Sequence, residues 1–260
     1  MIPALLHQDP LGFWAHLAAA RRVLLGLDYD GTLAPFQVDR MAAVPLPGIV
    51  PALRAVTRDS STHLVIISGR RVTEVAELLG PVGVMMVGSH GYERRHADGR
   101  LEQVALDAMQ VAGLARALAQ GEHMGHGRRL ERKLASLAFH TRGMDPLHAQ
   151  TLERQMFETW SALTEASRLA CRHFDGGVEL RAEGVDKGTV LDSLLHELPV
   201  DLAVYVGDDA TDEDAFDVLR RQGGIGIKVG QGDTLAAGRL LDCTEVLQWL
   251  RRWTETRDRR

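Results

Sequence analysis

The sequence predicts an α/β protein in which a mainly parallel sheet carries an inserted, smaller α/β domain. Two observations predict this fold. Short apolar strands alternate with helix-length segments before residue 100 and after residue 184, as in βαβ units. Polar residues directly follow several of these strands, where parallel sheets bind their ligands. The 260-residue chain is 45% hydrophobic, which is enough to build such cores without disulfides.

The first elements follow from the spacing of apolar residues. Residues 11–21 are expected to form a helix because Trp14, Leu17 and Arg21 recur at near-helical intervals. The apolar run 23–27 predicts a buried strand, and a loop rich in proline follows it. The chain then alternates through a helix over 48–56, a strand over 63–67, a helix over 72–79 and a strand over 84–87.

Residues 100–184 break this alternation and predict the inserted domain. The expected elements are a helix over 106–120, a strand over 134–141, a long helix over 146–167 and strands over 169–172 and 177–181. The chain then returns to the first sheet with strands over 202–206 and 225–229 and a closing helix over 244–252. The predicted domains are therefore 1–99 with 185–260 for the core and 100–184 for the insert.

Composition narrows the class of partner. A net charge of −5 argues against a general nucleic-acid binder, and the basic clusters at 128–129 and 251–260 are expected to be solvated surface. Cys171 and Cys243 lack the spacing of a zinc site or a disulfide framework. No signal peptide or membrane-length apolar stretch is recognised. We expect a cytoplasmic protein, monomeric or weakly oligomeric, with no nucleic-acid or membrane partner.

The polar motifs follow four predicted strands. They are Asp28-Tyr29-Asp30, Ser68-Gly69-Arg70, Gly88-Ser89-His90-Gly91 and Gly207-Asp208-Asp209. Strand alternation points Asp28 and Asp30 to the same side, with Cα atoms about 6 to 7 Å apart. Such close carboxylates repel unless a cation or a phosphoryl group compensates them. Taken alone, the Asp28-to-Gly31 stretch is equally well a strand followed by a turn.

Four motifs in this order resemble those of the haloacid dehalogenase superfamily. They are Asp28-Tyr29-Asp30-Gly31-Thr32-Leu33, Ser68, Lys187 and Gly207-Asp208-Asp209-Ala210-Thr211-Asp212. The resemblance implies a Rossmann-like core with a cap domain and phosphoryl-transfer chemistry. It makes Asp28 the nucleophile that forms an aspartyl-phosphate and Asp30 the general acid and base. An acid at position 30, where the ion pumps of this superfamily carry threonine, favours a phosphatase or phosphomutase.

The same resemblance assigns the cofactor and the phosphate site. Mg²⁺ prefers hard oxygen ligands, and the matching positions are Asp28, the carbonyl of Asp30 and Asp208. The phosphate would bind Ser68, Lys187 and the backbone amides near Gly31 and Gly69. Asp209 and Asp212 would support the site by holding water or orienting the lysine.

Further motifs resemble the trehalose-6-phosphate phosphatase family. They include Ser68-Gly69-Arg70, Gly88-to-Glu93, Glu131-to-Arg142 and Gly177-to-Arg181, and the resemblance spans about 23–230. It implies that Glu131, Lys133 and Glu179 bind the sugar distal to the phosphate, with His140 and Arg142 as further candidates. Arg70 is also expected to contact substrate. His90 is equally well a sugar or phosphate contact or a capped histidine of the loop. Arg132, Leu134 and Thr141 depart from the commoner family pattern.

The predicted activity is hydrolysis of trehalose 6-phosphate, a small sugar phosphate, to trehalose and phosphate. Two alternatives stay open: a phosphatase of another glycosyl phosphate, such as mannosyl- or glucosyl-3-phosphoglycerate, and a non-catalytic regulatory domain of the same fold. An insert that closes as a lid would exclude water and select the sugar, so generic phosphates should turn over slowly.

Overall fold

The computed structural model describes residues 12–174 and 176–260, so Leu11 of the predicted first helix lies outside the described residues. The described chain forms two compact units. The core unit comprises the described residues up to Glu102 together with Asp186–Arg260, and the insert unit is Gln103–Val185.

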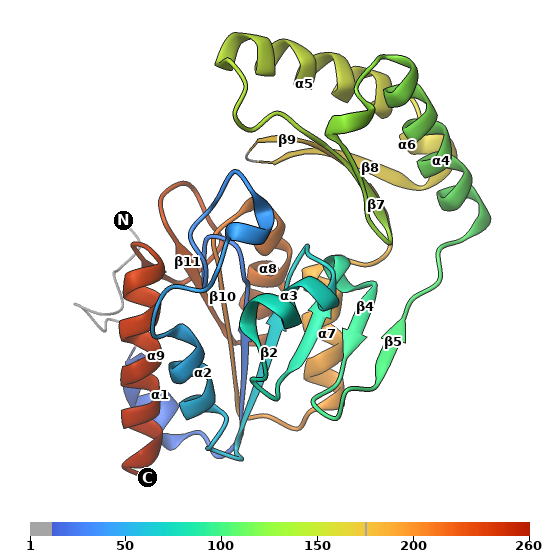
Figure 1. Cartoon of the computed structure of the whole chain (residues 1–260). Coiled ribbons are helices and arrows are strands. Elements are labelled where there is room, and N and C mark those ends of the chain that lie inside the picture. Colours follow the sequence, from blue (N-terminus) through green and yellow to red (C-terminus); the bar gives the residue numbers. More distant parts are fainter. Residues whose placement is uncertain (1–11, 175) are drawn as a thin grey trace. The chain divides into compact units, whose positions relative to one another are not determined.

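The core unit is built on one sheet, which in the described residues has eight strands in the order β12-β11-β10-β1-β2-β3-β4-β5 (Figure 1). The strands are β1 (Val23–Leu27), β2 (Thr62–Ile67), β3 (Met85–Gly88), β4 (Glu93–Arg95), β5 (Leu101–Gln103), β10 (Leu202–Gly207), β11 (Ile225–Val229) and β12 (Gly238–Leu240). All pairs from β12 to β3 are parallel, and β4 is antiparallel to β3. The predicted α/β class with a mainly parallel sheet is confirmed.

Helices cover both faces of this sheet. They are α1 (Phe13–Ala19), α2 (Ile49–Val56), α3 (Val72–Leu79), α7 (Lys187–Glu197), α8 (Glu213–Gln222) and α9 (Cys243–Asp258), with short 3₁₀ turns η1 (Arg40–Ala42), η2 (Ser89–Gly91) and η4 (Ala210–Asp212). One hydrophobic core joins α1, α2, α3 and α9 to the sheet, while α7 and α8 pack together on the other face (Figure 1). The fully buried Trp249 and Trp253 of α9 lie against Phe13 of α1.

Parallel pairing brings the predicted motifs to one edge of the sheet. Asp28 continues β1 by donating its N–H to Val206 O of β10 at 2.9 Å, and Ser68 continues β2 by donating to Val87 O of β3 at the same distance. The carboxyl ends of β10, β1, β2 and β3 are therefore adjacent, as the motif positions predict.

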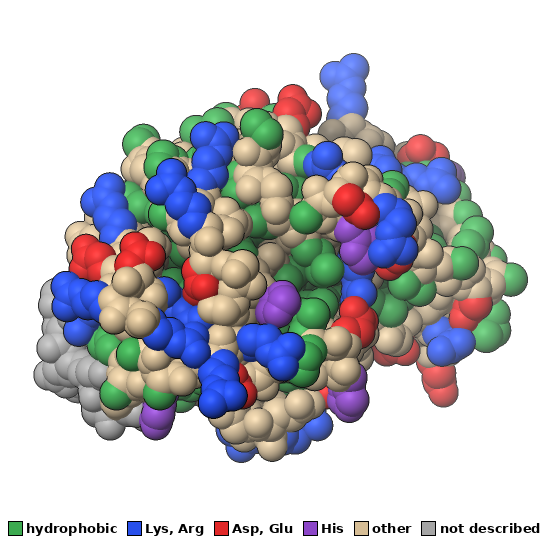
Figure 2. Space-filling model, turned by 90° about the horizontal axis from the view of Figure 1, so that it is seen from below, with side chains coloured by type: hydrophobic (Ala, Val, Ile, Leu, Met, Phe, Trp, Pro, Cys, Tyr) green, Lys and Arg blue, Asp and Glu red, His purple; other side chains and the backbone are tan. Residues whose placement is uncertain are grey.

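The C-terminal helix is longer than predicted, and part of its basic segment is not solvated surface. α9 runs to Asp258, and Arg257 is only 6% exposed. Its guanidinium donates to Asp59 Oδ2 at 2.8 Å and to the carbonyls of Leu17 and Ala20 at the end of α1. The expectation failed at Arg257 because these partners are distant in sequence. On the face shown in Figure 2, basic side chains are numerous and acidic ones stand among them.

The insert unit has its own sheet, which in the described residues contains four antiparallel strands in the order β6-β7-β9-β8. Its elements are α4 (Ala108–His123), η3 (Gly127–Arg129), β6 (Leu130–Arg132), β7 (Ser136–His140), α5 (Pro146–Ser161), α6 (Thr164–Ser167), β8 (Leu169–Phe174) and β9 (Gly177–Ala182). Helices cover one face: the ring of His173 stacks on Phe157 of α5, and Trp160 of α5 donates to Ala117 O of α4. The smaller α/β insert is confirmed.

Several predicted boundaries are corrected. The strand expected over 134–141 is the shorter β7, and it forms a hairpin with β6, which was not predicted. Lys133 N–H donates to Ser136 O in the connection between them. The helix expected over 146–167 is two helices that separate at Ala162 and Leu163. Strands β4, β5 and β12 have three residues each and were not predicted, because so short a segment shows no clear period. Among the described helices, none has the length and apolarity needed to cross a bilayer.

Candidate active site

The carboxyl end of β1 holds a buried lysine between two carboxylates. Lys187, the first residue of α7, donates from Nζ to Asp28 Oδ1 at 2.9 Å and to Asp212 Oδ1 at 2.7 Å. The three side chains are at most 6% exposed. Asp186 caps α7 by accepting from the Thr189 N–H, which fixes the helix start next to the lysine. The structure thus brings together three residues that are far apart in the sequence.

Burial sets the ionisation of this group. Desolvation raises the pKa of Asp28 well above its ordinary value, although the Lys187 ammonium opposes this. Desolvation also raises the pKa of Asp212 against the same ammonium. Burial alone would lower the pKa of Lys187, but the carboxylates of Asp212 and Asp28 outweigh it and raise that pKa well above its ordinary value. These carboxylates therefore favour the charged form of the lysine at this site.

Asp212 is a fully engaged carboxylate. Its Oδ1 accepts from Lys187 and from the Tyr205 hydroxyl at 2.6 Å, and its Oδ2 accepts from the backbone N–H groups of Asp208 and Asp209, both at 2.9 Å. Four donors leave it little capacity for another ligand. Asp212 accordingly orients the lysine and the turn after β10.

Asp208, unlike Asp212, has a carboxylate oxygen without a hydrogen-bond partner in the described part of the chain. One oxygen each of Asp28, Asp208 and Asp212 lies within 4.8 Å of the others. Asp208 Oδ1 is buried and has no hydrogen-bond partner among the described residues. Burial, with added repulsion from Asp212 and Asp209, raises the pKa of Asp208 to about 8. Adjacent carboxylates with an unsatisfied oxygen fit a hard divalent cation, for which Asp28 and Asp208 are the available side chains.

Gly31 permits the close approach of the loop after β1 to Asp208. Its φ is +72°, and a Cβ atom there would lie 2.1 Å from Asp208 Oδ2. Only glycine fits both the left-handed backbone and this contact. Cys243, at the start of α9, donates from Sγ to Gly31 O at 3.3 Å and supports the same loop.

Lys228 is a functional candidate that the sequence analysis missed. This residue of β11 is 5% exposed, and its Nζ donates to the carbonyl of Asp208 and, at 3.5 Å, to that of Asp209. The Asp212 carboxylate accepts from the backbone N–H groups of the same two residues. The turn is therefore held at its carbonyls by Lys228 and at its N–H groups by Asp212. A lysine inside the apolar run 225–229 was the available signal, because a buried strand rarely carries an ammonium. Asp209 itself accepts from Thr211 N and Oγ1 at 2.7 Å and caps η4.

Asp30 has a different partner from Asp28. Arg70 grips the Asp30 carboxylate with two parallel hydrogen bonds, from Nε at 2.6 Å and from Nη2 at 2.7 Å. The guanidinium lies over the Tyr29 ring, and its Nη1 is buried without a hydrogen-bond partner among the described residues. The sequence predicts Arg70 as a substrate contact, and the structure places it directly beside Asp30 with its Nη1 unused.

The loops after β2 and β3 are interlocked. Ser68 Oγ accepts from Arg70 N–H at 3.1 Å, and the backbone N–H of His90 donates to Ser68 O at the same distance. The His90 ring covers Gly69, where a Cβ atom would lie 2.6 Å from His90 Cε1. Ser89 and His90 have φ of 51° and 57°, a strained conformation for residues with a side chain.

This strained pair is held by Glu93. The buried Glu93 carboxylate accepts from Ser89 Oγ at 3.0 Å and from Val72 N–H at 3.1 Å. Local strain that the surrounding contacts maintain is common at functional sites. The predicted residues Ser68, Gly69 and His90 therefore lie in contact with one another in the loops after β2 and β3.

In the insert unit, Glu131, His140 and Glu179 lie on the same face of the sheet. Glu131 Oε2 lies 2.8 Å from His140 Nε2, and Lys133 Nζ donates to Glu179 Oε1 at 2.8 Å. Glu131 and Lys133 therefore have different partners, although their spacing predicted one side of one strand. Arg142 packs against Gly176, where a Cβ atom would lie 2.3 Å from Arg142 Cγ.

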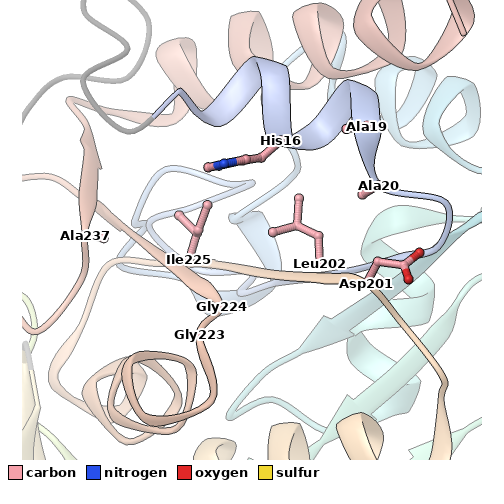
Figure 3. Close-up of a pocket in the computed structure, with 9 residues that line it drawn as sticks. All are labelled: His16, Ala19, Ala20, Asp201, Leu202, Gly223, Gly224, Ile225 and Ala237. Carbon is pink, nitrogen blue, oxygen red and sulfur yellow. The ribbon is translucent and has the colours of Figure 1, made fainter.

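A cavity of about 560 Å³ lies at the other end of the core sheet (Figure 3). It is bordered by α1 and by Leu202 and Ile225, the first residues of β10 and β11. Its charged or titratable side chains are His16 and Asp201, and Asp201 accepts from the Arg22 N–H at 2.8 Å. This mainly apolar hollow lacks the grouped carboxylates and donors of the opposite edge, so it is not the candidate active site.

Comparison with known proteins agrees with this arrangement. The trehalose-phosphatase family profile matches residues 26–238, a range that contains every residue described above at the carboxyl edge except Cys243. The chain belongs to the trehalose-phosphatase family. This confirms the predicted family and the predicted enzyme class, a phosphatase.

Relatives in this family cover most of the chain. The trehalose-6-phosphate phosphatase of Escherichia coli is 31% identical over 228 residues, 86% of this chain and 83% of that protein. A bifunctional trehalose-6-phosphate synthase/phosphatase of Thermoproteus tenax is 32% identical over 86% of this chain, which corresponds to 31% of that protein.

The solved structures share the fold. The C-terminal domain of Candida albicans trehalose-6-phosphate phosphatase matches 98% of this chain and 98% of that chain with a TM-score of 0.86 at 22% identity. A haloacid dehalogenase-like hydrolase from Bacillus subtilis matches 88% of this chain and 98% of that chain with a TM-score of 0.64 at 16% identity. The predicted superfamily fold is confirmed.

Proposed function

We propose that this phosphatase hydrolyses trehalose 6-phosphate to trehalose and phosphate, with Mg²⁺ and through an aspartyl-phosphate on Asp28. The observation that carries the proposal is the Asp28 carboxylate, buried at the end of β1 between the Lys187 ammonium and Asp208. The substrate is that of the 31% identical relative from Escherichia coli.

The first step uses the nucleophile and the acid. Asp28 attacks phosphorus, a carboxylate oxygen–phosphorus bond forms, and the bond from phosphorus to the sugar oxygen breaks. Asp30 gives a proton to the departing sugar oxygen. Arg70 orients Asp30 through its two hydrogen bonds, and its unused Nη1 is available to a phosphoryl oxygen.

The second step returns the enzyme to its starting state. Asp30 takes a proton from water, the water oxygen bonds to phosphorus, and the bond to Asp28 breaks. Lys187, the Ser68 hydroxyl and the amides of Gly31 and Gly69 donate to the equatorial phosphoryl oxygens, where negative charge accumulates. Donors that are in position before the reaction would need little reorganisation during it.

The residues that would hold Mg²⁺ are Asp28, Asp208 and the backbone carbonyl of Asp30. When bound, the ion would offset the repulsion between the negative charges of the Asp28 carboxylate and the phosphate. The unpartnered Oδ1 of Asp208 supports this assignment.

The insert face would recognise the sugar. Glu131, Lys133 and Glu179 offer acceptors and donors for hydroxyl groups, and His140 and Arg142 border them. His90 would contact the substrate from the core unit.

The test is phosphate release from trehalose 6-phosphate, glucose 6-phosphate and glucosyl-3-phosphoglycerate, with Mg²⁺ and with a chelator. We expect the trehalose ester to react fastest and the chelator to abolish turnover. Preference for the phosphoglycerate would establish the alternative substrate class, and equal rates on all three would exclude selection by the insert.

Substitution of Asp28 tests the mechanism. Asp28→Asn should lower kcat by about 10⁴-fold or more on every ester, because the amide cannot form the acyl phosphate. Appreciable residual turnover would contradict the aspartyl-phosphate. A wild-type chain inactive on all esters would instead favour a regulatory role, since the C-terminal domain of a trehalose synthase regulatory protein shares the fold with a TM-score of 0.74.

A further inference from the structure

Arg181 of β9 is a buried arginine with an unsatisfied hydrogen-bond donor. The residue is 5% exposed, and its Nη1 is buried with no hydrogen-bond partner among the described residues. Arg257, which is similarly buried, donates to a carboxylate and to backbone carbonyls. Burying an unpaired polar group costs free energy, so an arginine left in this state points to a ligand that completes its hydrogen bonds.

The position of Arg181 on the sheet identifies its surroundings. Strand alternation puts Arg181 and Glu179 on the same face of β9. Arg181 is paired directly with Ser136 of β7, whose Oγ donates to Glu179 Oε1 at 2.8 Å. Lys133 donates to the same oxygen. Arg181 therefore belongs to one polar group with Lys133, Ser136 and Glu179.

This group lies on the face of the sheet opposite the helices. Neighbouring residues of the other face, Val178 and Leu180, pair with His173 and Cys171 of β8, which contact Phe157 of α5. The helices are therefore not the missing partner of the guanidinium.

We propose that Arg181 is a further sugar-binding residue that determines specificity. Its Nη1 donates to a hydroxyl oxygen next to the hydroxyl that Glu179 binds. A hydroxyl both donates and accepts, so a carboxylate and a guanidinium side by side match two adjacent hydroxyls. The nearby Glu179 charge disfavours an anion at the same point. The inference rests on the proposed function, because it assumes that this face receives the sugar.

The experiment compares Arg181→Met and Arg181→Lys with Arg154→Met, a control on the exposed surface of α5. Arg181→Met should raise KM for trehalose 6-phosphate about 10- to 100-fold, which corresponds to the loss of one hydrogen bond from a charged donor. Its kcat on p-nitrophenyl phosphate should be unchanged, and Arg181→Lys should recover part of the affinity. The control should match the wild type throughout.

Two binding measurements separate this role from a structural one. Calorimetric affinity for trehalose should fall in Arg181→Met, while affinity for inorganic phosphate should stay the same. The melting temperature should change little, because methionine removes a buried nitrogen that has no hydrogen-bond partner among the described residues. The proposal would be overturned if Arg181→Met bound trehalose as tightly as the wild type, whatever its melting temperature. It would also be overturned if the variant lost affinity for inorganic phosphate as much as for trehalose. Failure of the proposed function would appear earlier, as a wild-type chain inactive on trehalose 6-phosphate.

Discussion

The core and insert units each contain a lysine that contacts a carboxylate at nearly the same distance. Lys187 lies 2.9 Å from Asp28 with side chains 2% and 6% exposed, and Lys133 lies 2.8 Å from Glu179 with side chains 14% and 11% exposed. Lys187 also donates to Asp212, whose carboxylate accepts three further hydrogen bonds. The two lysine–carboxylate distances are therefore similar, but the hydrogen-bond networks around them differ. The core lysine contacts two buried carboxylates, whereas Lys133 contacts one carboxylate that also accepts from Ser136.

The difference fits the two tasks in the proposed function. Phosphoryl transfer needs donors that are in place before the reaction, because moving them during the reaction would cost free energy. Sugar binding requires the insert groups to exchange their mutual hydrogen bonds for bonds to hydroxyls. Pairs such as Glu131 with His140 keep these groups satisfied until then.

The largest expected effect is the loss of the core lysine. Lys187→Met leaves two carboxylates buried without their cation, so we expect the free energy of unfolding to fall by about 3–5 kcal/mol and phosphatase activity to disappear. Urea denaturation in chelator measures the first quantity. A loss below about 1 kcal/mol would show that the contacts of Lys187 with Asp28 and Asp212 stabilise the fold no more than a surface ion pair does.

A smaller effect should sharpen the description of the core. Lys228→Met removes the donor to the carbonyls of the turn that carries Asp208, so Mg²⁺ affinity should fall about 10- to 100-fold. Isothermal calorimetry of Mg²⁺ binding tests this apart from turnover. Lys228→Arg should recover part of the affinity. Unchanged Mg²⁺ affinity in a folded Lys228→Met protein would show that Asp212 alone fixes the turn.

The smallest expected effect is in the insert. Lys133→Met should change the free energy of unfolding by only about 1 kcal/mol, because Ser136 still donates to Glu179. The expected kinetic result is a higher KM for trehalose 6-phosphate with unchanged turnover of p-nitrophenyl phosphate. If the stability loss equalled that of Lys187→Met, the contrast between the two units would be wrong.

Much of the core could be predicted because its signals are local. An apolar run that ends in Asp28 and Asp30 marks a strand and its carboxyl end, and Ser68 and Asp208 repeat that pattern at two other strands. The insert was harder to predict. Its hairpin at Glu131 and Lys133 has strands of three and five residues, too short for alternation to locate the turn.

The amino-acid sequence by itself determined the class of fold, the family and the edge of the sheet where the acids gather, because strand period and the order of the motifs can be read directly along the chain. Only the tertiary structure decided the partners: Asp30 with Arg70, Lys133 with Glu179, Lys228 with the carbonyl of Asp208, and Arg181 without a partner at Nη1. These contacts depend on strand register and on burial, which arise when distant segments pack together.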